Sequence, residues 1–504
     1  MKKTFQLIAA LLIVLAMATA CSKESYTPGT GSGGGTVTPT PTESISDEIK
    51  NADLFAQDAL DVFYLWNKEI ESEISSKLNP ATCKDPIAVV EEIKYKEDRW
   101  TELFDDITPF KESVEGISTT NGMSLSVGTF TDTNNYFFIV NFVYAGSPAE
   151  KAGIKRGDVI IYYNKNIIND SNLMDAYYGE TSASYGLAEW TDTGIADLDK
   201  SVTLNPVKMY LDPIIINKTF DVNGKKVGYL MYDSFDIESV EKMIEVCKQF
   251  KSQGVKELIL DLRYNGGGYV FTEEVMASLF APESAVKAKS LYMKEVYNSV
   301  LTEAWSKDDP EFNLTYLSFN HEFGTKGSSD YKNVSTANAN IGLEKIYAIV
   351  NSNTASASES LLVGLNPYMS IVTVGQQTHG KFCTGYILGS DDLYDMLNRP
   401  SFDKNKISKW GIYVMVSTYS DKNGNNMCRP DGIKPNIEAS DEPWEGIALG
   451  NENESMLKAA LTAAGKNYTT TRMLQTRPRL DVKTLPNKYK FGRRIKELPE
   501  EKLK

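Results

Sequence analysis

The chain of 504 residues is long enough for two to four domains and a large buried core. Hydrophobic residues make up 41% of it and charged residues 24%, which is ordinary for a soluble globular protein. The net charge of −14 argues against nucleic acid as a partner, because binding to phosphates requires a basic face.

Residues 1–20 are predicted to be a signal peptide, with Lys2 and Lys3 at its basic end and an apolar core too short to span a bilayer comfortably. The sequence Ala-Thr-Ala-Cys that ends at Cys21 resembles the cleavage site of bacterial lipoproteins. This resemblance implies a lipid on Cys21 and attachment to a membrane of the cell envelope, namely the outer membrane, on its periplasmic or its exposed face. The alternative is an ordinary secretory signal that happens to end near a cysteine.

Two segments of different character follow. Residues 21–45 contain a run rich in Gly, Thr and Pro that cannot bury a core, so it is predicted to be a flexible tether. Residues 46–112 are predicted to be mainly helical, because apolar residues recur at helical spacing from Ile49 to Leu65.

A strand-helix-strand pattern begins after residue 220. Asp221 to Phe235 reads as a hairpin that turns at Asn223-Gly224. A helix from Glu238 to Ser252 and a buried strand from Glu257 to Leu262 follow, which predicts a right-handed parallel crossover. Three glycines then end at Gly268 and allow close approach of the backbone to a ligand.

The stretch from Lys345 to Tyr386 carries the strongest signal for chemistry. An apolar strand ends at Val350, a run of small residues follows, and a helical pattern resumes at Glu359. Ser356 is therefore expected at the start of a helix, beside backbone N–H groups that can receive negative charge. A nucleophile beside such donors is half of a site for acyl transfer, whereas the alternative is an ordinary helix N-cap serine.

A serine hydroxyl needs a base, and the chain has only two histidines. Lys381, which is 25 residues after Ser356, is the candidate base, because a Ser-Lys pair is a known alternative to Ser-His. Its pKa must fall by about 3 units from about 10.4, which corresponds to about 4 kcal/mol and requires burial without a carboxylate partner. We expect Lys381 to be buried against apolar surface, within hydrogen-bond reach of Ser356.

Four motifs in order resemble the C-terminal processing (tail-specific) serine peptidase family, and the resemblance covers roughly residues 50–445. They are GSPAEKAGIKRGDVI at 146–160, DLRYNGGG at 261–268, TASASE at 354–359 followed by Lys381, and RPDGIKPNI at 429–437.

The resemblance implies a mixed α/β fold with a crotonase-like ββα-type core. It divides the chain into an N-terminal helical segment (46–112), a PDZ-like peptide-binding domain (113–212), a catalytic domain (213–445) and a C-terminal helix with a tail (446–504). It also implies a Ser356-Lys381 dyad, an oxyanion hole made by the Ala357 and Gly267 amides, and no metal or cofactor. The candidate carboxylate-binding loop of the PDZ-like domain is Gly122, Met123, Ser124 and Leu125.

Two further observations leave questions of function open. The family often has a glutamine four residues after the lysine, but this chain has Gly385 there, and Thr384 or His379 are candidate substitutes. Residues 281–344 look like an insertion that forms a lid or a subsite wall. The leading hypothesis is a serine endopeptidase that cleaves exported or unfolded proteins. The alternatives are a catalytically defunct, peptide-binding surface lipoprotein and a hydrolase of small esters.

Overall fold

Two β-sheets with helices packed between them form the centre of the fold in a computed structural model of the chain. The structure describes residues 44–130, 133–191, 194–308, 316–324, 333–468, 482–483 and 492–498. The predicted signal peptide, Cys21 and nearly all of the predicted tether lie outside these ranges. No helix within them has both the length and the apolar character needed to cross a bilayer.

The first of these sheets, called the core sheet here, has six strands in the order β10-β11-β12-β18-β19-β22. Its strands are β10 (Ile214–Val222), β11 (Lys225–Tyr232), β12 (Glu257–Asp261), β18 (Lys345–Val350), β19 (Ser370–Gly375) and β22 (Ile437–Glu438). β10 and β11 are antiparallel, and every later pair is parallel. The turn between β10 and β11 has positive φ at Asn223 and Gly224, 54° and 80°, as a type I′ hairpin turn requires.

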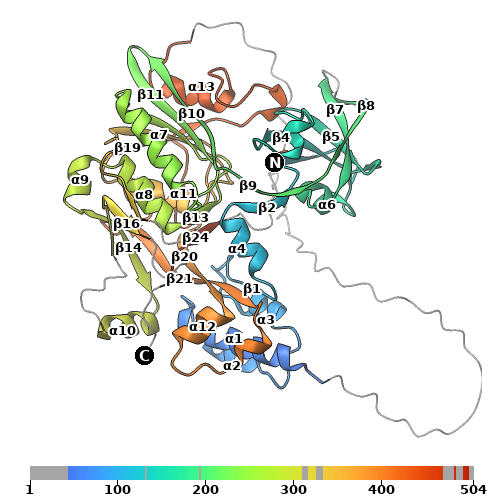
Figure 1. Cartoon of the computed structure of the whole chain (residues 1–504), viewed down its shortest axis with the longest axis vertical. Helices are drawn as coiled ribbons and strands as arrows, with labels where there is room; N and C mark the ends of the chain where they lie inside the picture. Colours follow the sequence, from blue (N-terminus) through green and yellow to red (C-terminus); the bar gives the residue numbers. More distant parts are fainter. Residues whose placement is uncertain are drawn as a thin grey trace, which may run out of the picture. The chain divides into compact units, whose positions relative to one another are not determined.

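Helices cover both faces of the core sheet, so its inner strands β12 and β18 are mostly apolar and buried. Alternate residues of β12 show this: Leu258 and Leu260 pack with α7 (Val240–Ser252), α8 (Val270–Phe280) and α11 (Ala357–Leu365). Ile259, which points the other way, packs with α13 (Ser455–Ala463). Figure 1 shows α7, α8 and α11 grouped together, away from α13.

The second sheet has the order β13-β24-β20-β21-β14-β15, with β1 also paired to β21. Its strands are β1 (Glu102–Phe104), β13 (Gly267–Tyr269), β14 (Leu291–Tyr297), β15 (Tyr316–Ser318), β20 (Cys383–Gly389), β21 (Gly411–Asp421) and β24 (Arg493–Ile495). β14 belongs to the region expected to be an insertion, but it is an internal strand, paired with both β15 and β21. The expectation of an insertion is therefore wrong for β14, because an internal strand is part of the sheet itself. Its partner β21 lies more than 100 residues further along the chain, so the sequence has no local signal for this pairing.

The region predicted to be PDZ-like (113–212) supplies all strands but β23 of a third sheet, in the order β23-β3-β4-β5-β7-β8, with β6 paired to β5. Its elements are β3 (Met123–Thr129), β4 (Tyr136–Val143), α5 (Pro148–Lys151), β5 (Val159–Tyr163), β6 (Asn166–Ile167), α6 (Leu173–Tyr178), β7 (Ala183–Thr191), β8 (Gly194–Leu204) and β23 (Val482–Lys483). A separate antiparallel pair, β2 (Ile117–Thr120) and β9 (Val207–Tyr210), lies where the chain enters and leaves this region.

The N-terminal helices pack on the second sheet. Phe55 and Phe63 of α1 share an apolar cluster with Tyr386 of β20 and Tyr413 of β21. The N-terminal helices are α1 (Asp47–Phe63), α2 (Glu71–Lys77), α3 (Pro86–Ile93) and α4 (Thr108–Val114). The remaining elements are α9 (Glu283–Lys287), α10 (Ser299–Asp308), β16 (Glu322–Gly324), β17 (Asn333–Ser335), α12 (Ser390–Met396), η1 (Lys404–Lys406) and η2 (Pro443–Glu445).

Candidate active site

Ser356 occupies a strained turn between β18 and α11. Its φ and ψ are 63° and −112°, a region that residues with a side chain rarely adopt. The hydroxyl is buried and has no hydrogen-bond partner among the described residues. The Ser356 N–H is instead capped by Glu359 at 2.8 Å, so the hydroxyl does not serve as an ordinary N-cap. A buried polar group without a partner requires an explanation, and nucleophilic chemistry supplies one.

Asn265 joins the glycine loop after β12 to the Ser356 turn. Its carbonyl oxygen accepts from the Ala355 N–H at 3.1 Å and from the Ser358 hydroxyl at 3.1 Å. Ser358, the other serine of the TASASE motif, therefore has its hydroxyl hydrogen-bonded to the glycine loop. The side-chain oxygen of Asn265 accepts from the Gly267 N–H at 2.8 Å. The amide expected to be one oxyanion donor is thus already hydrogen-bonded, whereas Ala357 begins α11 and its N–H has no acceptor within the helix.

Glu359 connects the serine turn to the lysine loop. Its Oε2 accepts from the Ser356 N–H at 2.8 Å and from the Lys381 N–H at 2.9 Å. Its Oε1 accepts from the Gly380 N–H at 2.7 Å and from the Thr378 hydroxyl. Burial raises the pKa of Glu359, and the hydrogen bonds that it accepts oppose this rise. One oxygen atom shared by the two backbones brings Ser356 and Lys381 into a single site.

Lys381 is fully buried, as expected of a lysine base. Burial lowers its pKa from 10.5 to about 7, and no carboxylate of the described residues forms an ion pair with it. The ammonium lies 5.2 Å from the Trp100 ring centroid and 4.7 Å from that of Tyr413. It donates to the Tyr413 hydroxyl at 2.8 Å and to the Gly492 carbonyl at 2.5 Å. The expected hydrogen bond between Ser356 and Lys381 is not formed in this structure.

Tyr413 uses the space that Gly385 leaves. A Cβ on Gly385 would lie 2.5 Å from Cε2 of the Tyr413 ring, so a glutamine at 385 is incompatible with this ring position. The Tyr413 hydroxyl thereby reaches Lys381 and orients it. Thr384, one of the substitutes proposed from sequence, instead hydrogen-bonds to Glu295 at 3.1 Å. Burial and the nearby cations lower the pKa of His379, the other candidate, to about 3, so this imidazole is neutral near pH 7.

The predicted carboxylate-binding loop leads into β3. Gly122 has φ of +85°, and its N–H donates to the Thr120 hydroxyl at 3.0 Å. The Met123 N–H donates to the Asn121 side chain at 3.0 Å. Ser124 and Leu125 already belong to β3 and pair with β4. The first two amides of the loop are therefore engaged within the loop, and receiving a carboxylate there would require them to exchange partners.

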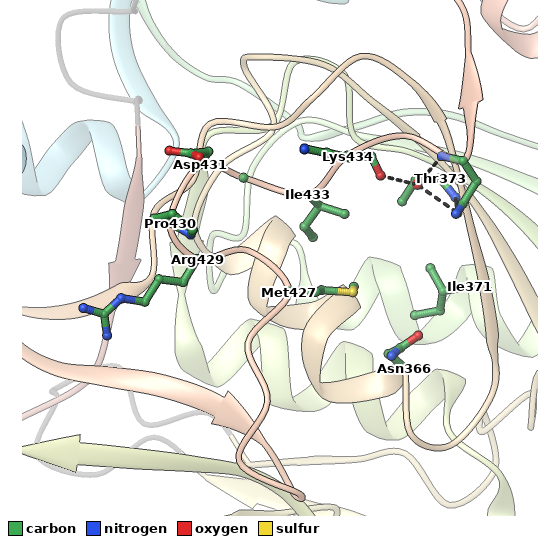
Figure 2. A pocket seen from close by; sticks show the side chains of 11 residues that line it. Asn366, Ile371, Thr373, Met427, Arg429, Pro430, Asp431, Ile433 and Lys434 are labelled. Carbon is green, nitrogen blue, oxygen red and sulfur yellow. Dashed lines mark hydrogen bonds between the residues drawn. The ribbon is translucent and has the colours of Figure 1, made fainter.

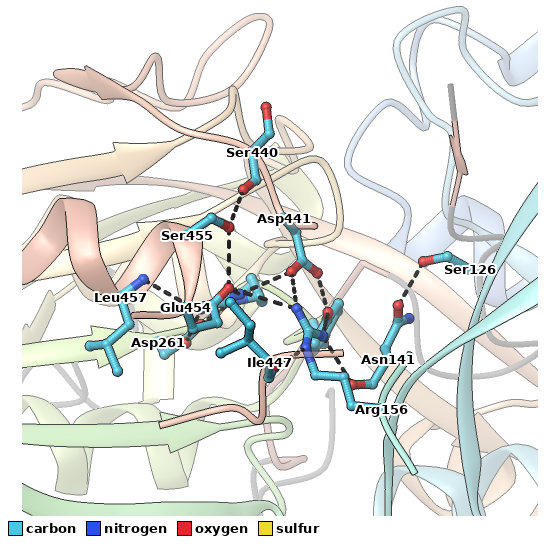
Figure 3. Close-up of polar contacts among 12 residues, drawn as sticks. Ser126, Asn141, Arg156, Asp261, Ser440, Asp441, Ile447, Glu454, Ser455 and Leu457 are labelled. Atoms are coloured by element: carbon cyan, nitrogen blue, oxygen red, sulfur yellow. Dashed lines mark hydrogen bonds and ion pairs between the residues drawn. The ribbon is translucent and has the colours of Figure 1, made fainter. Parts of the chain in front are cut away.

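The DLRYNGGG motif also supplies a buried ionic cluster (Figure 3). Arg263, with no exposed surface, pairs with Asp261 at 2.7 Å, with Glu454 at 2.7 Å and with Asp441 at 3.1 Å. Arg156, from the loop between β4 and β5, pairs with the same Asp441 at 2.6 Å. Burial disfavours the Asp441 carboxylate, but the two guanidinium groups outweigh it and hold its pKa at about 2. This cluster ties the third sheet to the core sheet.

The RPDGIKPNI motif hydrogen-bonds to the loop between β19 and β20, which carries Lys381. The Thr378 N–H donates to the Ile433 carbonyl at 3.1 Å, and the Ile433 N–H donates to the Thr378 hydroxyl at 2.7 Å. A pocket of about 460 Å³ opens on the outer side of this loop, with Met427, Arg429 and Lys434 around it (Figure 2). Neither Ser356 nor Lys381 lines this pocket, so it is separate from the dyad.

The sequence predicts Ser356 and Lys381 as site residues, but it did not point to Glu359, Tyr413 or the segment around Gly492, which lie beside them. Glu359 lies within the quoted motif, and its spacing of three from Ser356 was a readable capping signal. Tyr413 and Gly492 lie on distant segments and had no local signal.

Comparison with known proteins confirms the resemblance to C-terminal processing peptidases. The family model described as peptidase family S41 matches residues 226–439. The carboxyl-terminal-processing protease of Picosynechococcus sp. is 24% identical over 380 residues, which are 74% of this chain and 77% of that protein. The carboxy-terminal processing protease CtpA of Bacillus subtilis is 25% identical over 240 residues, 47% of this chain and 42% of that protein.

A solved structure shares the fold. It is described as an S41 protease from Bacteroides fragilis, and it matches with a TM-score of 0.61 and 20% identity over 82% of this chain and 97% of its own length. The mixed α/β architecture is therefore that of this group of proteins.

Proposed function

Residues 226–439 of this chain are a peptidase family S41 domain, and from this premise we propose that the protein is a serine endopeptidase that uses a Ser356-Lys381 dyad. The proposal rests on the unusual environments of two side chains at the site, Ser356 and Lys381. Ser356 lies in a strained turn and has a buried hydroxyl that no described residue hydrogen-bonds, and Lys381 has a buried amine whose pKa is about 7. A serine nucleophile and a lysine that is half neutral near pH 7 are what acyl transfer needs.

The proposed reaction has two steps that balance in protons. Neutral Lys381 takes the proton of the Ser356 hydroxyl as its oxygen attacks the peptide carbonyl, and the resulting ammonium protonates the leaving amine. Water then attacks the acyl-enzyme and gives a proton to Lys381. The bond between the acyl group and Ser356 breaks, Lys381 returns that proton to the Ser356 oxygen, and the acid product is released. The Ala357 amide and one amide of the glycine loop, Gly267 by resemblance, hold the oxyanion, which requires the Gly267 N–H to leave Asn265.

Exported or unfolded proteins are the proposed substrates, and the third sheet is proposed to bind their C-terminal stretch along the edge of β3. The assignment of Cys21 as a lipid attachment site stays a prediction. Fatty-acid labelling that is present in the parent and absent in Cys21→Ala would support it.

The test uses protein that begins at Ser22, incubated with an unfolded protein substrate. Cleavage is expected for the parent and is expected to vanish in Ser356→Ala and in Lys381→Ala. Ser352→Ala and Lys434→Ala are matched controls, because both side chains are exposed and lie near the site in sequence or in space. Cleavage that survives in Ser356→Ala would refute the dyad.

One observation favours a second candidate, a peptide-binding protein without turnover. The Lys381 ammonium donates to a backbone carbonyl of the chain itself and not to Ser356. This candidate predicts binding of peptides with no cleavage by the parent at any pH between 6 and 9.

A further inference from the structure

A short segment of the same chain lies in the candidate active site. Residues 492–498, called the 492–498 segment here, contribute β24, which runs between β13 and β20 and is parallel to both (Figure 1). The Arg493 N–H donates to the Gly266 carbonyl at 2.9 Å, and the Lys496 N–H donates to the Gly385 carbonyl at 3.1 Å. The segment is therefore bound as an added strand between the glycine loop and the strand that follows Lys381, which is a common way of binding peptides.

The backbone of this segment meets the proposed catalytic groups. The Gly492 carbonyl accepts from Lys381, and the Arg494 carbonyl accepts from the Tyr413 hydroxyl at 3.3 Å. Gly267 lies between this segment and Ser356. A Cβ added to Gly267 would lie 2.1 Å from the Arg493 carbonyl oxygen and 3.0 Å from the Ser356 Cβ. A peptide carbonyl thus lies beside the nucleophile, in the space that only a glycine at 267 leaves free.

The next side chain, Arg494, enters a buried acidic pocket. Its guanidinium pairs with Glu273 at 2.8 Å and with Glu295, and it donates to the Ser360 hydroxyl at 3.0 Å. The Tyr419 ring covers it at 4.9 Å. Arg494, Glu273 and Glu295 have no exposed side-chain surface. The planar guanidinium is the cation best suited to two carboxylates at such distances.

The two carboxylates of this pocket require positive charge nearby. Glu295 also pairs with Lys496 at 2.7 Å, so the segment brings two cations to two buried carboxylates. Burial alone disfavours the Glu295 carboxylate, but Lys496 and Arg494 lower its pKa to about 2. If the segment leaves, both carboxylates lose their cationic partners and keep only hydrogen bonds from neutral hydroxyls, and a buried charge without an opposite charge is strongly unfavourable. A replacing peptide must therefore supply a cation at the same position.

Residues 482–483, which precede the 492–498 segment in the chain, pair with the edge of the third sheet. β23 pairs antiparallel with β3, with Val482 opposite Gly128 and Lys483 opposite Val127. Its direction leads toward Gly122, the end of β3 where the carboxylate of a bound peptide is expected. Residues 482–483 and 492–498 thus lie against the two surfaces that the proposed function assigns to substrate.

Resting on the proposed peptidase function, we propose that the channel between β13 and β20 binds substrate peptides and that its Glu273-Glu295 pocket is a subsite for an arginine side chain. The arginine is the residue directly after the carbonyl that faces Ser356. In the resting protein the 492–498 segment occupies this channel and inhibits the enzyme until a peptide with arginine at that position displaces it.

Cleavage of quenched peptides tests the subsite on the full chain. The peptides are Gly-Arg-Arg-Ile-Lys-Glu-Leu, which copies residues 492–498, and the same peptide with Met in place of its second arginine. We expect kcat/KM to be at least about tenfold higher for the arginine peptide, since one such charged contact contributes at least about 1.5 kcal/mol. Equal rates would overturn the subsite. In Glu295→Gln the preference is expected to fall below about threefold, and its folding is checked by circular dichroism.

The resting occupant is tested by Arg494→Met, which weakens the segment's hold on the pocket. This variant should cleave the arginine peptide several-fold faster than the parent does, whereas Arg399→Met, at an exposed arginine, should not differ from the parent. A permanent structural strand predicts the reverse, a loss of both activity and thermal stability in Arg494→Met, and that result would overturn the inhibitory role.

Hydrogen exchange in Ser356→Ala separates this proposal from the peptidase itself. Adding the N-acetylated arginine peptide should speed exchange of the 492–498 amides, and the methionine peptide should not. If displacement occurs but no variant or parent cleaves anything, the subsite stands and the peptidase fails. If unfolded protein is cleaved but neither peptide changes the exchange, the peptidase stands and the subsite fails.

Discussion

Removing the Tyr413 hydroxyl should shift the pH at which the enzyme becomes active. Tyr413→Phe keeps the ring at its 4.7 Å distance from the Lys381 ammonium and deletes only the hydroxyl, which accepts from that ammonium at 2.8 Å. The base works when neutral, so activity rises with pH through the pKa of Lys381, which is about 7 in the parent. Losing an acceptor that stabilises the charged form lowers this pKa further.

The size of the shift follows from the hydrogen bond. A bond to a charged group contributes about 1.5–3 kcal/mol, and the neutral amine keeps a bond of about 1 kcal/mol with the phenol. The difference of about 1 kcal/mol or slightly more corresponds to a fall of about 1 pKa unit. The neutral fraction of Lys381 at pH 6 then rises about fivefold, whereas at pH 8 the base is almost fully neutral in both proteins.

The assay is kcat/KM for a quenched peptide between pH 5 and pH 9, because this ratio reports the free enzyme. The ratio of kcat/KM in the variant to kcat/KM in the parent should be about fivefold higher at pH 6 than at pH 8. Comparing the two pH values removes any loss of activity that arises because Lys381 is less well oriented, since that loss is the same at both. Tyr394→Phe, at a partly exposed tyrosine on α12, is the control and should leave the midpoint unchanged. An identical midpoint in Tyr413→Phe and parent, or a parent midpoint near pH 10, would refute this account of Lys381.

Two further predictions concern Lys381 and Glu359. Since the folded pKa of Lys381 is about 7 and its ordinary value is 10.5, the unfolded chain binds more protons between these pH values, and the parent gains stability as pH rises through them. The stability advantage of Lys381→Met over the parent should therefore shrink by about 2.5 kcal/mol from pH 6 to pH 9 in urea unfolding, and a constant difference would contradict this. Glu359→Gln turns an amide N–H₂ toward buried donors, so it should cost about 2–4 kcal/mol and most of the activity. Thermal unfolding and kcat/KM measure the two losses, and an unchanged melting temperature would count against the linking role of Glu359.

Much of the local structure could be read from the sequence. The strand up to Val350, the helix up to Leu365 and the turn at Asn223-Gly224 all appear where periodicity and turn chemistry predict them. These features depend on neighbours in the chain, so a one-dimensional pattern contains them. The pairing of β14 with β21 was missed because it joins segments more than 100 residues apart.

At the candidate site, too, some features follow from local sequence and others depend on long-range contacts. Residue types and spacing, together with the family resemblance, predict Ser356 and Lys381 as the dyad, since a nucleophile and its base must be particular residues. Their states, however, are properties of the packed molecule. The lowered pKa of Lys381 comes from burial, and Tyr413 reaches its amine from another strand, through space left by Gly385. The 492–498 segment reaches the site from more than 100 residues away in sequence. Residue types and their spacing thus predict which groups could react. The protonation of these groups, their partners and the segments that lie against them depend on burial and long-range contacts, which have no local pattern in the sequence.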